Sequence, residues 1–312
     1  MPHFLSTTAI TAVCMLLAAP AQAAISRTYV ASFGSDANTA FSCDFSHPCR
    51  TLQTAFSQVT DGGEILAVDG SGYGPIVINR SVSIIANPGV FAGIGVFGGG
   101  TGVAIATPGI NVTLRGLTIN GQGGTYGINM TAGARLSIEN CVIANFSNGT
   151  GYGLSVTTPA TVRIVDSIIR DNYYGAFVQG GATSDISGSK FLGNSYAIYS
   201  SGVAAGATTA AVSDTVVSGS SVAGIVAHAN NAAAISRVEI IRAVVTNGGD
   251  GVVSSSLSGT ASIILSESMV TSNFLNGLSQ SGAGATFTSL SNNTVAANGS
   301  NTSGTISTAT PL

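Results

Sequence analysis

The chain has 312 residues, of which 7% are charged, and its formal net charge is −3. It contains 41 glycines and 45% hydrophobic residues, whereas disordered chains combine low hydrophobicity with high charge. The composition therefore favours a glycine-rich, all-β fold. The small negative charge gives no electrostatic reason to bind nucleic acid or an anionic membrane surface, so we expect neither as a partner.

Residues 1–23 predict a secretory signal peptide. The segment 9–19 is mostly apolar and uncharged, and Ala21-Gln22-Ala23 gives a small-x-small cleavage site. This apolar run is shorter than a membrane span, and no later segment approaches one. We therefore expect a secreted or periplasmic protein with no membrane span.

The cysteines predict one local disulfide. Cys43 and Cys49 bracket a short loop of a secreted chain, which favours a bond between them. Cys141 stands at the small position of a repeat, where later copies have Ser167 and Ser189, so we expect a buried thiol there. The sequence has no Cys-x-x-Cys motif and no histidine cluster, and we predict no metal site and no cofactor.

The segment 24–75 predicts an N-terminal cap made of a strand, the Cys43–Cys49 loop, a short helix and the first strands, among them residues 64–68. Residues 27–33 form a strand pattern, and apolar residues from Leu52 to Val59 follow a helical spacing, with Thr51 as the expected N-cap. A solenoid exposes its first coil, and a short amphipathic helix can cover it. We assign 76–301 to the coils and 302–312 to a C-terminal tail, which is either a loose end or a final strand.

The coils are predicted from a pattern that recurs between residues 138 and 298. It consists of an apolar residue, any residue, Asn/Asp/Glu, a small residue, any residue and an apolar residue, followed after two or three residues by Asn. The closing asparagines are 22 to 27 residues apart, with one double step of 53, and this period is typical of a solenoid of about nine coils. We expect the asparagines to form hydrogen bonds between neighbouring coils at a tight bend. They are Asn145, Asn172, Asn194, Asn247, Asn273 and Asn298.

The repeat from Ile138 to Asn298 resembles the right-handed parallel β-helix of the pectin-lyase-like superfamily. The opening, from Tyr29-Val30 through Pro48-Cys49-Arg50-Thr51-Leu52-Gln53 to Gly72-Tyr73, is similar to the N-terminal segment of many secreted bacterial members. The resemblance implies an all-β fold with a single right-handed parallel β-helix and a short N-terminal capping helix. The superfamily includes polysaccharide lyases, hydrolases and esterases, and also members with no known reaction.

The motifs that such enzymes share are missing from this sequence. Hydrolases of the fold resemble one another in Asn-Thr-Asp, Asp-Asp, Gly-His-Gly and Arg-Ile-Lys segments, and none occurs here. We interpret His47 and His228 as surface residues, the first in the Cys43–Cys49 loop and the second in a turn. The residues leave open whether the chain is an enzyme. If it is a lyase or hydrolase with a different site, the catalytic candidates are Asp166, Arg170 and Asp171, although the two aspartates lie on opposite sides of one strand.

The third positions of the repeats form one column of interest. In it Arg242 falls between Asp214 and Glu267 of adjacent coils, about one strand spacing from each. One interpretation is a charge ladder in which opposite charges alternate, and the other is a carboxylate cluster for a cation or a sugar. The aligned residues are Asn140, Asp166, Gly188, Asp214, Arg242, Glu267 and Asn292.

A second column consists of tyrosines at spacings of 26, 22 and 22 residues, namely Tyr126, Tyr152, Tyr174 and Tyr196. One interpretation is an aromatic stack that stabilises the coils. The other is a sugar-binding strip about 14 Å long, in which flat rings contact pyranose C–H groups. Further candidates for substrate binding are Tyr173, Arg170 and Lys190, and Tyr199 and Asp171 are also close.

We therefore predict a secreted, monomeric protein that binds extracellular polysaccharide along one face of the solenoid. Two alternatives remain. The chain is a polysaccharide lyase or hydrolase with a non-standard site, or it is a structural or interaction rod of the cell envelope without catalysis. The identity of the glycan does not follow from the sequence.

Overall fold

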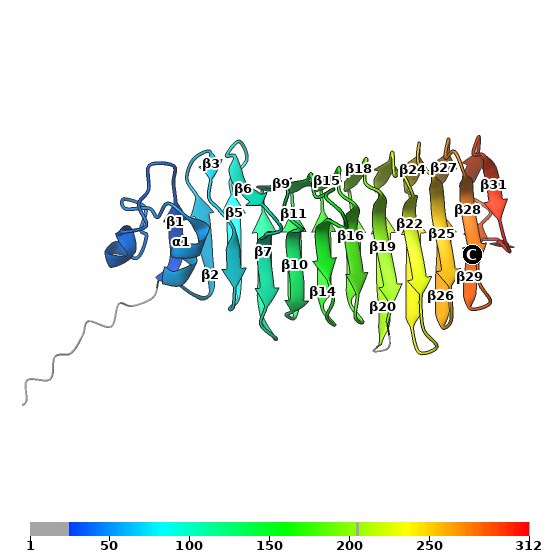
Figure 1. Cartoon of the computed structure of the whole chain (residues 1–312), viewed down its shortest axis with the longest axis horizontal. Helices are drawn as coiled ribbons and strands as arrows, with labels where there is room; N and C mark the ends of the chain where they lie inside the picture. Colours follow the sequence, from blue (N-terminus) through cyan, green and yellow to red (C-terminus); the bar gives the residue numbers. More distant parts are fainter. Residues whose placement is uncertain (1–24, 204–205, 312) are drawn as a thin grey trace, which may run out of the picture.

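The structure is a computed structural model that describes residues 25–203 and 206–311. The predicted signal peptide, residues 1–23, lies outside these residues. The described chain forms a rod of parallel coils with a short helix at the N-terminal end (Figure 1). Its three parallel sheets, A, B and C, contain twelve, ten and ten strands in the described residues. The predicted single parallel β-helix is therefore confirmed. No helix in the described part is long and apolar enough to cross a membrane.

Each full coil adds one strand to each sheet in the order A, B, C. Sheet A contains β1 (Ile25–Val30), β2 (Val59–Ala67), β5 (Val82–Ala86), β8 (Asn111–Arg115), β11 (Arg135–Glu139), β14 (Thr161–Val165), β17 (Thr183–Ser187), β20 (Ala207–Ser213), β23 (Ile235–Ile241), β26 (Thr260–Ser266), β29 (Ala285–Leu290) and β32 (Ser307–Ala309). Sheet B contains β3 (Ser71–Gly72), β6 (Ala92–Phe97), β9 (Leu117–Gln122), β12 (Val142–Ala144), β15 (Ile168–Arg170), β18 (Lys190–Leu192), β21 (Val216–Ser218), β24 (Val244–Thr246), β27 (Met269–Thr271) and β30 (Thr294–Ala296). Sheet C contains β4 (Ile76–Ile78), β7 (Thr101–Ala106), β10 (Tyr126–Ala132), β13 (Tyr152–Val156), β16 (Tyr174–Gln179), β19 (Tyr196–Gly202), β22 (Ala223–Ala229), β25 (Asp250–Ser256), β28 (Asn276–Ser281) and β31 (Ser300–Ser303).

The core is a set of aliphatic stacks that run along the rod. Successive side chains of a strand point to opposite faces, so every second residue points inward. Ile138 pairs with Ile164, which pairs with Ile186, and all three are fully buried. Repetition of the same residue type at one position in the coil therefore builds a continuous apolar interior.

The corner between sheets A and B is made by a residue in the left-handed conformation. Six of the seven aligned third positions of the repeats have φ values between 47° and 59°, a region that Asn, Asp and Gly enter more readily than other residues. This conformation explains why Asn and Asp recur in the column and why Gly188 fits it. The residues are Asn140, Asp166, Gly188, Asp214, Arg242 and Glu267.

The asparagine ladder at the corner between sheets B and C differs from the prediction, because it does not include all the predicted residues. Asn172, Asn194 and Asn273 are buried, and Asn273 hydrogen-bonds Asn298 of the next coil. Asn145 and Asn247 instead lie one position earlier, exposed at the left-handed bend, with φ values of 69° and 55°. The buried position of these two coils is taken by Phe146 and Gly248, whose backbone amides donate to Asn172 and Asn273. The ladder therefore has two runs, interrupted at Ser220 and Gly248.

The N-terminal cap contains η1 (Asn38–Phe41) and α1 (Leu52–Gln58). Thr51 is the N-cap as predicted, because its hydroxyl accepts a hydrogen bond from the Thr54 amide at 3.3 Å. The Cys43–Cys49 disulfide is also present. The first strands, which we placed in the cap before residue 76, include β2 and β3, and these pair with β5 and β6 of the following coil. At the other end β31 and β32 extend the sheets beyond residue 301, so the predicted tail includes final strands.

Candidate functional site

The four tyrosines of the predicted column lie side by side on the outer face of sheet C. Each begins a strand, and the strand register pairs each tyrosine with the tyrosine of the next coil. Neighbouring ring centroids are 5.1 Å apart, and the rings are 13° to 16° from parallel. The strand register therefore confirms that these tyrosines occupy the same position in successive coils, as their spacing predicted. They are Tyr126, Tyr152, Tyr174 and Tyr196.

The stacking changes what this column offers to a ligand. Tyr152 and Tyr174 each have a tyrosine ring on both sides. Tyr173 adds edge contacts, with its ring centroid 4.9 Å from that of Tyr174 and 5.9 Å from that of Tyr196. The flat ring surfaces expected for pyranose stacking are thus largely directed at other tyrosines. A ligand along the column would meet ring edges and phenol hydroxyls.

A second aromatic column lies farther along the same strands. The Phe177 and Tyr199 rings stack at a centroid distance of 5.6 Å, and Tyr199 also meets Tyr174 and Tyr196 edge to face. His228 belongs to β22, rather than to a turn as predicted, and its ring lies beside that of Tyr199. A ring nitrogen of His228 contacts the Ser255 hydroxyl at 2.8 Å. Phe177 was missed in the sequence because it occurs once at its position, so no repetition marks it.

We call the outward aromatic side chains of these coils the aromatic face. Burial and neighbouring tyrosines raise the pKa of Tyr174 to about 12, and burial also raises the pKa of Tyr199. Both phenols are therefore neutral at ordinary pH. None of the six tyrosine hydroxyls of this face has a hydrogen-bond partner among the described residues, so each can bond to a ligand or to water. The aromatic face consists of Tyr126, Tyr152, Tyr173, Tyr174, Tyr196, Tyr199 and Phe177.

The aromatic face carries almost no charge. Among the described residues, the strands of sheet C contain one charged side chain, Asp250, which accepts a hydrogen bond from Asn276 at 2.8 Å. Burial lowers the pKa of His228, which keeps its ring neutral. The strands of sheet A, by contrast, carry both signs of charge, as in the Arg115–Glu139 pair. A ligand on the aromatic face therefore meets a neutral surface.

Arg170 and Lys190, predicted beside the tyrosines, lie on a different sheet. They belong to β15 and β18 of sheet B, and no described contact joins either residue to the tyrosines. Arg170 donates to the Asp171 carboxylate at 2.5 Å, so its charge is partly neutralised within its own coil. The structure therefore separates the predicted binding set into an aromatic face on sheet C and two cations on sheet B.

The catalytic candidates Asp166 and Asp171 are also apart. Asp166 occupies the corner before β15 and Asp171 the corner after it, both with positive φ. Their carboxylates lie over glycines of the next coil, Gly188 and Gly193 respectively. They share no described contact, and no cluster of three metal-binding side chains occurs in the described residues. The geometry therefore does not bring Asp166 and Asp171 together as an acid–base pair.

The arrangement of coils is matched by the comparisons with known proteins. The model of the right-handed β-helix region matches residues 64–210 and 101–298, more than half of the chain. The chain belongs to the right-handed β-helix family. The crystal structure of pectate lyase Pel9A is similar to this β-helix, with 16% sequence identity and a TM-score of 0.58, over 91% of this chain and 77% of that chain. At this identity the likeness shows the fold alone. A comparison with curated proteins found no match.

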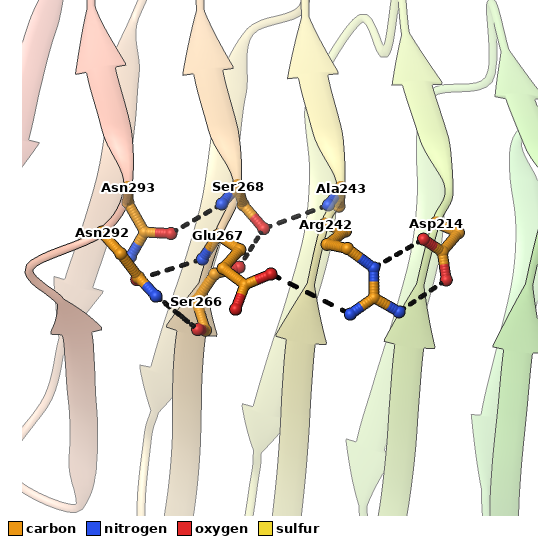
Figure 2. A network of polar contacts seen from close by, with 8 residues as sticks. All are labelled: Asp214, Arg242, Ala243, Ser266, Glu267, Ser268, Asn292 and Asn293. Carbon is orange, nitrogen blue, oxygen red and sulfur yellow. Dashed lines mark hydrogen bonds and ion pairs between the residues drawn. The ribbon is translucent and has the colours of Figure 1, made fainter. Parts of the chain in front are cut away.

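The predicted charge ladder lies at the A–B corner of the β-helix, near its C-terminal end. Arg242 binds Asp214 through two hydrogen bonds, of 2.7 and 2.8 Å, and reaches Glu267 at 4.0 Å (Figure 2). Arg242 therefore forms ion pairs with both carboxylates, and the pair with Asp214 is the shorter one. This geometry favours the charge ladder over a cation or sugar site.

Proposed function

We propose that this β-helix binds extracellular polysaccharide along its aromatic face. The observation that carries the proposal is the row of six tyrosine hydroxyls on consecutive coils, which have no hydrogen-bond partner in the part of the chain that the structure describes. A polysaccharide presents hydroxyls at a regular repeat, and a row of phenols at a regular repeat can donate hydrogen bonds to them and accept hydrogen bonds from them. The ring edges supply the apolar contact between these bonds.

The stacked rings also support the alternative interpretation of the column, in which the tyrosines stabilise the coils. Stacked rings contribute about 0.5–1.5 kcal/mol per pair beyond the burial of their area. Phenylalanine would stack as well and would remove four polar groups from the half-buried surface. Tyrosine at all four positions therefore supports a role for the hydroxyls that stacking alone does not require.

The neutrality of the aromatic face supports an uncharged glycan. An anionic polysaccharide would find no lysine or arginine on the strands of sheet C, and it would approach Asp250. The polysaccharide context is also supported by the fold, which this chain shares with a pectate lyase. The proposal includes secretion, with cleavage after Ala23, and this part is tested by N-terminal sequencing of protein recovered from the medium or the periplasm.

Affinity electrophoresis in gels that contain neutral or acidic polysaccharides tests the binding. The wild-type chain should be retarded by at least one neutral polymer. The double variant Tyr152→Phe/Tyr174→Phe, which keeps the rings, should be retarded less, and Tyr152→Ala/Tyr174→Ala should lose retardation. Phe274→Ala is the control, because Phe274 is 64% exposed and lies outside the aromatic face. Equal retardation of wild type and the alanine double variant would refute the proposal.

The enzymatic alternative has its own measurement. Release of reducing ends or of unsaturated products from the same polymers would establish a lyase or hydrolase. Loss of that release in Asp166→Asn or Asp171→Asn would assign it to the predicted candidates. The separation of these aspartates at two corners of the coil leads us to expect no release. If the chain is instead an envelope rod, it should bind none of the polymers and should be recovered with envelope proteins after cross-linking.

A further inference from the structure

A second candidate site is a groove on the outer face of sheet B, next to the N-terminal cap. Its volume is about 440 Å³, and it runs across β3, β6 and β9. This volume lies within the range of about 300–1,000 Å³ that is usual for small-molecule sites. The groove precedes the first tyrosine of the aromatic face in sequence and faces a different side of the β-helix.

Two phenylalanine rings form the apolar part of the groove. Phe91 is 57% exposed and Phe97 is 66% exposed, although large apolar side chains are usually buried in such a rod. Each ring lies over a glycine of β6. A Cβ atom at Gly93 would be 2.8 Å from the Phe91 ring, and one at Gly95 would be 3.5 Å from the Phe97 ring. The glycines thus support the rings from one side and leave ring surface open to solvent.

The neighbouring strand supplies the polar part. The register places Thr118 beside Gly93, Asn120 beside Gly95 and Gln122 beside Phe97. The Asn120 side-chain oxygen accepts a hydrogen bond from Asn145 at 2.6 Å, which fixes the orientation of its amide. No described residue hydrogen-bonds the Gln122 side chain, and its Nε2 lies 3.8 Å from the position of a Gly95 Cβ. The amide of Gln122 therefore reaches over the floor of the groove.

The groove has no charged lining residue. The nearby Arg50 donates to the Gly72 carbonyl oxygen at 2.8 Å, so its guanidinium is already engaged by the backbone. Aromatic surface on one strand and free amide groups on the next match a ligand with one apolar face and a rim of hydroxyls. An uncharged pyranose has this form, whereas a purely apolar ligand would leave the Gln122 amide without a partner.

We propose that the groove between Phe91, Phe97 and Gln122 binds a neutral sugar unit. The ring surfaces of Phe91 and Phe97 contact its C–H groups, and Gln122 and the free Asn120 amide hydrogens bond its hydroxyls. This site stands on its own geometry and does not depend on binding at the aromatic face.

Saturation-transfer NMR with a panel of neutral methyl pyranosides tests the site in the chain from residue 24. At least one pyranoside should show saturation transfer, and Phe97→Ala and Gln122→Ala should each weaken its binding about ten-fold, which corresponds to about 1.4 kcal/mol. Circular dichroism checks that these exposed substitutions leave the fold intact. Phe274→Ala is the control for loss of an exposed ring elsewhere, and it should bind as the wild type does.

The double variant Tyr152→Phe/Tyr174→Phe separates this site from the aromatic face. It should bind the methyl pyranosides as the wild type does, even where its retardation by polysaccharide is reduced. The proposal is overturned if no pyranoside binds, if Phe97→Ala and Gln122→Ala bind with unchanged affinity, or if apolar aromatic compounds bind and sugars do not displace them.

Discussion

Asn172 donates two hydrogen bonds to one oxygen of Asn194 in the next coil. Its side-chain amide lies 2.9 Å from the Asn194 Oδ1 atom, and its backbone nitrogen lies 3.1 Å from the same atom. Asn194 in turn donates to the Ile169 carbonyl oxygen at 3.0 Å. One buried side chain thus satisfies polar groups of two coils at the corner between sheets B and C.

The substitution Asn194→Ala should therefore destabilise the β-helix. It leaves the Asn172 backbone amide without an acceptor in a buried corner and leaves its side-chain amide only the Ile143 carbonyl oxygen, 3.4 Å away. Each unsatisfied donor costs about 1–3 kcal/mol. Guanidinium-induced unfolding should show a lower free energy of unfolding. Asn111→Ala, at an exposed position of β8, is the control and should leave the midpoint nearly unchanged. An equal effect of both substitutions would contradict the role of the ladder.

The sequence predicted those features of the fold that repeat. The spacing of Tyr126 and Tyr152 placed them on adjacent strands, and the register confirms it. The pattern could not separate the exposed asparagine of the bend from the buried asparagine one position later, because the same residue type suits both the left-handed conformation and the ladder. It therefore misplaced Asn145 and Asn247. It placed the first strands in the cap and assigned the coils from residue 76, because the repeated pattern is absent before that residue.

The candidate sites were harder to predict because they depend on how single side chains lie. An aromatic stack was one of the two interpretations of the tyrosine column, but the spacing could not decide between them, since stacking depends on ring orientation. The separation of Arg170 from the tyrosines follows from one corner between sheets B and C, and closeness in sequence concealed it. The groove at Phe91 and Phe97 does not repeat, so only the structure reveals that Gly93 and Gly95 support their rings.

The thiol of Cys141 should be unreactive in the folded chain. Burial raises the pKa of this thiol to about 11, so the thiolate that reacts with alkylating reagents is scarce at neutral pH. Iodoacetamide should label Cys141 only after unfolding, as mass spectrometry can measure. Rapid labelling of the native chain would show that the corner opens.

The substitution Cys141→Ser should preserve the fold. Cys141 contacts the carbonyl oxygen of Glu139 through its sulfur, and Ser167 contacts that of Val165 in the same way through its hydroxyl at 2.9 Å. Cys141 is buried at the position that serine occupies in later coils, as predicted. A serine hydroxyl at this position could donate to the Glu139 carbonyl oxygen. We expect a change of less than about 1 kcal/mol in the free energy of unfolding, whereas Cys141→Leu should be much more damaging because the corner has no room for it.

The Arg242 ladder predicts a dependence on acidic pH. The hydrogen bonds from Arg242 hold the pKa of Asp214 below its ordinary value of 3.8. A lowered folded-state pKa stabilises the chain above the unfolded-state pKa, and this contribution is lost as pH falls through the folded-state pKa. In Arg242→Gln the pKa of Asp214 should rise, as NMR titration of its carboxylate can show. The stability difference from wild type should be small, because the pair is exposed, and should vanish when Asp214 is protonated in both chains.

The aromatic face predicts a dependence on alkaline pH. Burial, with neighbouring tyrosines, raises the pKa of Tyr174 from 10.0 to about 12. A raised folded-state pKa gives a stability contribution that is complete below the unfolded-state pKa and is lost as pH rises through the folded-state value. Phenolate absorbance should show late-titrating tyrosines in the native chain, and denaturant should bring them to the ordinary range. Tyr174→Phe should remove one of the late-titrating groups. A single titration step near the ordinary value in the native chain would contradict the packing of this face.

We predict that the break in the asparagine ladder divides the rod into two cooperative units. Ser220 fills the buried corner position without a partner for its hydroxyl among the described residues, and Gly248 follows it in the next coil. Backbone amides at the corners of these two coils should exchange with deuterium faster than those near Asn172 or Asn273, because local opening there breaks fewer side-chain bonds. Ser220→Asn should extend the first run, slow this exchange and raise stability by about 1 kcal/mol. The molecule would then open from its ends and no longer from its middle.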